Sequence, residues 1–216
     1  YIMALPVVNE VEFFTTIPST KQEIKFHPFT VKQQKALLLA RESGEDKDIV
    51  NAVVNVLNDC IVEDLDVSKL ASFDVQYLFL QIRGKSIGEF VEFKIPHYQN
   101  QECNHPLELS INFDDIKVNF PEGHSNKIQI NDKYGMVLKY PSIVTMSDID
   151  DTSQVESNLK FISKSIEMVY DDEKVYDDFS EQEAYDFLMT LTTDQLDKIL
   201  TFYRSLPSIK YDIEFD

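Results

Sequence analysis

IKFHPFTVKQQKALLLA, residues 24–40, changes its periodicity in the middle. Its first residues are β-branched or aromatic, as is typical of a strand. Pro28 restricts His27 to an extended conformation, and Phe29 and Thr30 then have the pattern of a hydrophobic staple followed by an N-cap. The stretch therefore predicts a strand that runs directly into a helix, and this junction is structural in kind.

A hairpin is expected before the junction and helices after it. Val11–Ile17 and Glu23–Phe29 read as two strands joined through Pro18-Ser19-Thr20. The helix that begins at Thr30 carries apolar side chains and should end at Gly44. A second helix is predicted from Asp46 to Ile61, with one face formed by Ile49, Val53, Val56, Leu57 and Cys60. A third is predicted to start at Asp74 and stop at Gly84, and it bears Val75, Leu78, Phe79 and Ile82.

The middle of the chain, from about Gly88 to Tyr140, has the pattern of strands. Phe90–Ile95 forms one predicted strand, and Leu107–Phe113 alternates apolar and polar residues as a half-buried strand does. Residues 96–106 connect these two strands. Residues 128–130 and 136–138 predict a further hairpin.

The last third is acidic and mostly helical. Val155, Leu159, Ile162, Ile166 and Val169 repeat at helical spacing. Ser180 with Glu183, and Thr192 with Gln195, are capping boxes that predict two further helices, the second of which ends at Pro207. A closing strand is predicted from the alternation of Ile209, Tyr211, Ile213 and Phe215. Such a strand would pair with an earlier strand or with the exposed edge of a partner.

These elements predict an α+β fold with two helical groups around a small antiparallel β region. We expect a hairpin with helices in residues 3–86, the β region in 87–142, and an acidic helical region with its closing strand in 143–216. They form either one compact unit or two small domains. Met3-Ala4-Leu5-Pro6 has the form of a natural start, so residues 1–2 are expected to be a remnant added before it.

Charge narrows the class of partner. The chain has 38 acidic and 20 basic residues, a net charge of −18, and residues 145–216 hold 18 of the acidic residues and 6 of the basic ones. This negative charge argues against binding to nucleic acid and against binding to an anionic membrane surface. A basic protein surface fits residues 145–216 better, and the alternative is that acidity only keeps the chain soluble. The chain has two cysteines, Cys60 and Cys103, and we find no export signal in the sequence. Both observations indicate a reducing, cytosolic compartment.

The sequence contains no convincing catalytic constellation and predicts no cofactor. Its five glycines form no phosphate-binding loop. The strongest metal candidates are His97, Cys103 and His105, which share one connection. A structural zinc site needs four ligands, and His124 is the one candidate for the fourth. A nucleophilic Cys103 with His97 or His105 is a weaker reading.

Two acidic clusters lack the spacing of a calcium loop. They are Asp148 with Asp150 and Asp151, and Asp171 with Asp172 and Glu173. We interpret both as carboxylates at helix N-termini, where the helix dipole favours negative charge, together with solvated surface.

The stretch at Pro28–Lys35 resembles the baseplate proteins of T-even-type contractile bacteriophages, which share a strand ending in Pro-Phe-Thr-Val-Lys before a Lys- and Leu-rich helix. Met3–Pro6, the helices from Asp46 and Leu70, and the terminal Leu206-Pro207 are also similar in order. The resemblance implies a subunit or an assembly protein of the baseplate hub, and it carries over no catalytic residue. Some relatives have a paired-cysteine ribbon where this chain has only Cys103 and His105.

The leading hypothesis is a non-enzymatic protein that binds other hub proteins, either as a structural subunit or as an assembly chaperone. It would act in the host cytoplasm during assembly and in the tail baseplate of the virion. The alternatives are an acidic inhibitor of a basic host protein, and a small zinc or thiol enzyme that uses His97, Cys103 and His105. The direct partner and the contact residues are not predicted.

Overall fold

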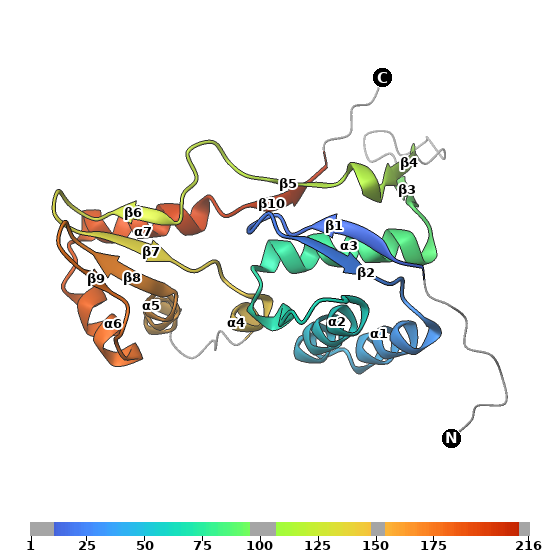
Figure 1. Ribbon diagram of the computed structural model, residues 1–216, viewed down its shortest axis with the longest axis horizontal. Helices are drawn as coiled ribbons and strands as arrows, with labels where there is room; N and C mark the ends of the chain where they lie inside the picture. Colours follow the sequence, from blue (N-terminus) through green and yellow to red (C-terminus); the bar gives the residue numbers. More distant parts are fainter. Residues whose placement is uncertain (1–10, 96–106, 148–153, 212–216) are drawn as a thin grey trace, which may run out of the picture. The chain divides into compact units, whose positions relative to one another are not determined.

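The computed structural model describes residues 11–95, 107–147 and 154–211 (Figure 1). Contacts divide the chain into two units. Of the described residues, the first unit contains 11–67, 74–95, 107–117 and 209–211, and the second contains 68–73, 118–147 and 154–208. Helices and small sheets occur in both, which confirms the α+β prediction. The described strands fall into four separate sheets instead of one β region. The segment limits predicted from the sequence stay a prediction.

The hairpin predicted before the junction is present in the first unit. Strands β1 (Phe13–Thr16) and β2 (Glu23–Phe26) pair antiparallel, with Phe14 opposite Lys25. The other edge of β2 meets the chain just after the second helix, where the Val62 N–H donates to the Lys25 carbonyl at 3.0 Å. Ile24 and Phe26 are buried. Strand β2 is thus hydrogen-bonded along both of its edges, to β1 on one side and to the chain after α2 on the other.

Three helices follow, at the expected places. They are α1 (Val31–Ser43), α2 (Asp46–Cys60) and α3 (Ser72–Ile87), with a short 3₁₀ turn, η1 (Val67–Lys69), before the third. Gly44 ends α1 in the left-handed region, at φ 74°. The prediction that Gly84 ends α3 is wrong. Gly84 instead lets Phe113 approach, because an added Cβ would lie 3.0 Å from the Phe113 Cβ.

The junction at residues 24–40 is held by polar contacts more than by an apolar helix face. The Thr30 N–H donates to Gln33 Oε1 at 3.1 Å, which forms the reciprocal half of a capping box. Gln33 is buried and donates to Asp59 on α2 at 3.2 Å. Phe29 packs on Phe79 of α3, with ring centroids 5.7 Å apart.

Two further sheets have two strands each. The two strands predicted on either side of residues 96–106 are present as β3 (Phe90–Ile95) and β4 (Leu107–Asn112), which pair antiparallel, and η2 (Phe113–Asp115) follows. The predicted closing strand is present as β10 (Ser208–Lys210), which pairs with β5 (Lys117–Asn119). The residues of that prediction beyond Tyr211 lie outside the described part of the chain.

The second unit is built on a four-stranded sheet in the order β6-β7-β8-β9. Its strands, β6 (Lys127–Gln129), β7 (Gly135–Leu138), β8 (Ile166–Tyr170) and β9 (Val175–Tyr176), pair antiparallel with their neighbours. The helices are α4 (Ile143–Ser147), α5 (Gln154–Lys164), α6 (Glu181–Met189) and α7 (Thr193–Arg204). The hairpin at 128–138 and both capping boxes are confirmed.

The prediction that one helix runs from Val155 through Val169 is wrong. Ile166 and Val169 do not continue the helix, because α5 ends at Lys164 and both residues belong to β8. Ser165 marks the break. Its N–H still donates back to the Phe161 carbonyl at 3.2 Å, while its own carbonyl accepts the Lys139 N–H at 2.8 Å, beside β7.

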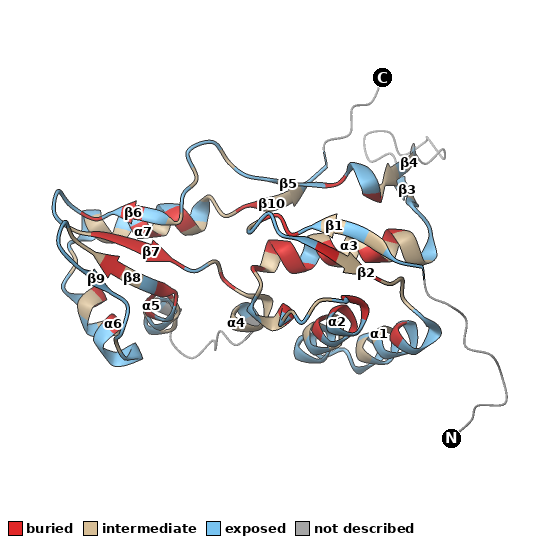
Figure 2. Cartoon of the chain, in the orientation of Figure 1, coloured by how far each residue is buried: buried red, intermediate tan, exposed pale blue. Residues whose placement is uncertain are grey.

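The core of the second unit lies between the sheet and its helices (Figure 2). Sheet residues of one face meet side chains of α5, α6 and α7, and this cluster comprises Ile128, Ile130, Met136, Leu138, Ile162, Ile166, Val169, Ala184, Leu188, Ile199 and Phe202. Among the described helices, none has the length and apolar character needed to cross a membrane.

Asp74 connects α3 to the β1–β2 turn in a way that the sequence did not indicate. It is fully buried, and its carboxylate accepts the Ser19 N–H at 2.9 Å and the Ser19 hydroxyl at 2.5 Å. Replacing Asp74 with Ala leaves these donors without that acceptor. We expect Asp74→Ala to lower the free energy of unfolding by about 2 kcal/mol, measured by urea denaturation.

Asp64→Ala is the control for this prediction, because Asp64 is exposed. We expect that change to stay within about 0.5 kcal/mol of the parent protein. Equal stability of the two variants would contradict the structural role of Asp74.

Candidate functional site

The structure tests only one of the four metal-ligand candidates. His97, Cys103 and His105 lie outside the described residues. His124 is described, and both of its ring nitrogens have partners in the second unit: Nδ1 lies 2.9 Å from Ser205 Oγ, and Nε2 lies 3.1 Å from the Tyr140 hydroxyl. Over the ranges that the structure describes, no three His, Cys, Asp or Glu side chains gather as metal ligands would.

His124 is part of an aromatic cluster. Its ring stacks on Phe202 at a centroid distance of 5.3 Å and on Tyr140 at 5.6 Å. Burial lowers the pKa of His124 below its usual 6.5, because the imidazolium is less well solvated there. The residue therefore joins the loop after β5 to α7 in its neutral form.

The lowered pKa of His124 predicts a pH-dependent stability. The unfolded chain binds a proton on this residue near pH 6.5, whereas the folded chain binds it only at lower pH. The stabilisation is thus present above pH 6.5 and is lost as the pH falls toward the folded pKa. We expect the stability of the parent protein to fall more steeply from pH 7.5 to about pH 5 than that of His124→Phe, measured by thermal unfolding.

The His124→Phe variant keeps an aromatic ring at this position and removes the titrating group. The other three histidines are the same in both proteins, so the difference between the two curves isolates His124. Parallel curves would show that the burial of His124 has no energetic consequence.

The two acidic clusters have different outcomes. Asp148, Asp150 and Asp151 lie outside the described residues. Asp171, Asp172 and Glu173 are described, and the expectation of a helix N-terminus is wrong for them, because they form the turn between β8 and β9. Asp171 Oδ1 accepts the N–H groups of Glu173 at 2.9 Å and Lys174 at 2.8 Å. This carboxylate therefore fixes a hairpin turn.

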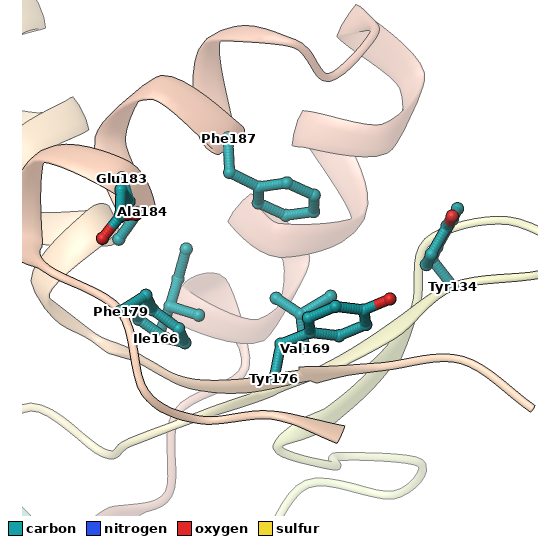
Figure 3. Close-up of a pocket in the computed structure, with 8 residues that line it drawn as sticks. All are labelled: Tyr134, Ile166, Val169, Tyr176, Phe179, Glu183, Ala184 and Phe187. Carbon is teal, nitrogen blue, oxygen red and sulfur yellow. The ribbon is translucent and has the colours of Figure 1, made fainter. Parts of the chain in front are cut away.

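A pocket in the second unit is the candidate functional site, and we name it the α6 pocket (Figure 3). It is an open pocket with a volume of about 290 Å³ between α6 and the β8–β9 end of the sheet. Phe187 of α6 faces Val169 and Tyr176 of the sheet across this space, and Tyr134 stands apart from them on the β6–β7 turn. The full lining is Tyr134, Ile166, Val169, Tyr176, Phe179, Glu183, Ala184 and Phe187.

Local hydrogen bonds place the walls of the pocket. Ser180 caps α6, and the Ser180 N–H donates to Glu183 Oε2 at 2.8 Å, so the start of the helix is fixed. On the opposite wall the Tyr176 hydroxyl donates to Asp171 Oδ2 at 3.3 Å. The Lys174 ammonium lies 4.6 Å from the centre of the Tyr176 ring. The turn thereby holds an aromatic side chain at the rim.

The same contacts set the charge states around the pocket. Hydrogen bonds from the N–H groups of Glu173 and Lys174 lower the pKa of Asp171, and the hydrogen bond from the Ser180 N–H lowers the pKa of Glu183. The negative charge of Asp171 raises the pKa of Tyr176. Asp171 and Glu183 are therefore anionic and Tyr176 is neutral at neutral pH.

This arrangement suits the binding of an apolar group. Seven of the eight lining residues are apolar or aromatic, and the eighth, Glu183, is engaged in the capping box. The lining thus offers aromatic faces and aliphatic groups, which bind through burial of apolar surface.

Sequence reasoning missed this pocket because it assigned Ile166 and Val169 to a helix. The signal that could have found it is the run Asp171–Lys174, which has turn-forming residues between two β-rich stretches. That run indicates a hairpin, and a hairpin followed by the Ser180 cap places α6 next to a sheet edge.

Comparison with protein families finds a match to this chain. A family model described as T4 bacteriophage base plate protein matches residues 9–216. Neither the curated proteins nor the solved structures contain a significant match to this chain. The family match includes every residue that the structure describes.

Proposed function

The chain belongs to the T4 bacteriophage base plate protein family, and from this premise we propose that it acts in the central hub of the baseplate by binding other hub proteins. The single observation that carries the proposal is the extent of the match, residues 9–216, because it covers the described elements of both units. The proposed place of action is the host cytoplasm during assembly and the tail baseplate afterwards.

Binding, and not catalysis, is the proposed mode of action. In the part of the chain that the structure describes, the α6 pocket offers an apolar lining whose one carboxylate caps a helix. The carboxylates of residues 145–216 are proposed to face a basic surface of a hub protein, since complementary charge speeds encounter and selects partners. The zinc or thiol alternative rests on His97, Cys103 and His105, outside the described residues.

The protein could be a permanent subunit or a chaperone that leaves before the tail is complete. Quantitative mass spectrometry of purified mature particles and of isolated hub intermediates separates these roles. We expect the chain in hub intermediates at a fixed copy number. The same copy number in the particle identifies a subunit, and absence from the particle identifies a chaperone.

Recovery on a basic host protein, with absence from both preparations, would contradict the hub proposal. That result would support the inhibitor of a host protein in its place. Competition between this chain and DNA for the host protein would then distinguish charge mimicry from other contacts.

Salt dependence tests the electrostatic part of the proposal. Screening shortens the Debye length from about 10 Å at 0.1 M salt to about 3 Å at 1 M salt. We therefore expect association with a hub intermediate to slow as salt rises over this range, measured by surface plasmon resonance with the intact chain. Association rates that do not change with salt would contradict a basic partner surface.

The zinc and thiol alternative has its own test. We expect purified protein to contain less than stoichiometric zinc by elemental analysis. We also expect Cys103→Ser to support hub assembly as the parent protein does, since binding needs no thiolate. One bound zinc per chain, or loss of function in Cys103→Ser, would favour the alternative.

A further inference from the structure

We propose that the α6 pocket is the docking site for a basic segment of another baseplate protein, which inserts one aromatic or long aliphatic side chain between α6 and the sheet. This inference rests on the proposed function and names the chemistry of the partner. Apolar burial would supply an anchor, and the surrounding carboxylates would select the residues that flank it.

The volume of the pocket fits such an anchor. An engineered apolar cavity of about 150 Å³ holds a benzene molecule. The α6 pocket has about 290 Å³, which leaves room for one large ring or for a long aliphatic side chain. Phe187 and Tyr176 present aromatic side chains on opposite walls (Figure 3). Pockets of this kind receive the central side chains of protein interfaces.

The charge around the pocket specifies the flanking residues. The β6–β7 turn supplies Tyr134, whose neighbours Asp132 and Lys133 have opposite charges. Residues 166–187 supply the rest of the lining and contain a single basic residue, Lys174. Their acidic residues are Glu167, Asp171, Asp172, Glu173, Asp177, Asp178, Glu181, Glu183 and Asp186. Lys164 compensates one of these, since its ammonium lies 3.6 Å from the Glu181 carboxylate. The remaining imbalance favours a segment with lysines or arginines beside its apolar side chain.

A metabolite fits the same site less well. Small-molecule pockets place several polar groups that converge on the ligand and orient it. Here the one charged lining residue, Glu183, accepts the Ser180 N–H at 2.8 Å and the Ser180 hydroxyl at 2.8 Å. The polar specificity of the site thus comes from its surroundings, which is the arrangement of an apolar interface centre with a charged rim.

A second copy of this chain is opposed by charge. Two copies at −18 each repel at long range, whereas a basic partner is attracted. Self-association through the pocket is nevertheless a distinct outcome that the experiment below can detect.

The test uses the intact chain and synthetic peptides. The probe is acetyl-KKFKK-amide, with a version in which Ser replaces Phe and an acidic version, acetyl-EEFEE-amide. We expect the first peptide to shift the amide resonances of Val169, Tyr176 and Phe187 in nuclear magnetic resonance spectra. The Ser peptide should bind about tenfold more weakly, since it lacks the buried ring. The acidic peptide should not shift these resonances.

Variants of the chain separate the anchor from the charge. Ala184→Leu fills the pocket from α6, and Tyr176→Lys places a cation at its exposed rim, so the second change remains informative if the first disturbs the core. Both should weaken binding about tenfold or more. Asp177→Lys with Asp178→Lys should also weaken binding. The control, Asp64→Lys with Asp115→Lys, makes the same change in net charge at exposed positions of the first unit and should leave binding unchanged.

Three results would overturn the inference. They are the absence of shifts at the pocket with the basic peptide, equal binding of the Phe and Ser peptides, and self-association of the parent chain that Tyr176→Lys abolishes in analytical ultracentrifugation. If the chain occurs in hub intermediates but the peptide does not bind, the proposed function stands and this docking site does not. If the peptide binds but the chain is absent from all baseplate preparations, the hub function fails and the specificity of the pocket stands.

Discussion

Strand β7 is buried at all four of its residues, Gly135–Leu138, and the second unit is arranged around that constraint. Met136 and Leu138 belong to the core that α5, α6 and α7 share. Gly135 lies opposite Tyr170, and an added Cβ would come within 2.3 Å of the Tyr170 ring. A strand enclosed in this way fixes its neighbours, because a shift of register by one residue would turn the apolar set away from the helices.

The α6 pocket follows from how the helices cover this sheet. β9 has two residues and stands at the end of the strand order, beside β8. Ala184 and Leu188 bury α6 against the core, while Phe187 is half-buried and faces the β8–β9 end. Small Ala184 on one wall and a short edge strand on the other leave space that the aromatic rings border but do not fill. The way in which α6 covers this sheet therefore accounts for both the buried core and the pocket.

Features that depend on neighbouring residues could be predicted from the sequence. The β1–β2 hairpin, the Gly44 helix end and the capping boxes at Ser180 and Thr192 all follow from local chemistry. Features that depend on distant residues could not. Asp74 reaches back to Ser19, and Gln33 is buried because Asp59 accepts its amide. The spacing of apolar residues along the chain does not indicate which polar residues far apart in the sequence will form hydrogen bonds.

The error at β8 has a specific physical origin. Ile162, Ile166 and Val169 have the spacing of one helix face, and they do bury against one core, but from two different elements. Ser165 ends the helix, and β-branched Ile166 then suits a strand. The pocket lies against β8. The wrong assignment of Ile166 and Val169 to a helix therefore hid the pocket as well as the strand.

Charge and apolar burial have separate roles at this surface. Asp171 and Glu183 are engaged by backbone N–H groups, which lowers their pKa values and holds the turn and the helix cap in place. The acidic residues at 172, 173, 177, 178 and 186 are exposed and repel one another, so the folded unit carries an unfavourable field that a cationic partner would relieve. Such a field acts over a Debye length and changes association rates, whereas a buried side chain mainly changes the dissociation rate. The exposed carboxylates would therefore speed association with a basic partner, and the side chain buried in the pocket would set the dissociation rate.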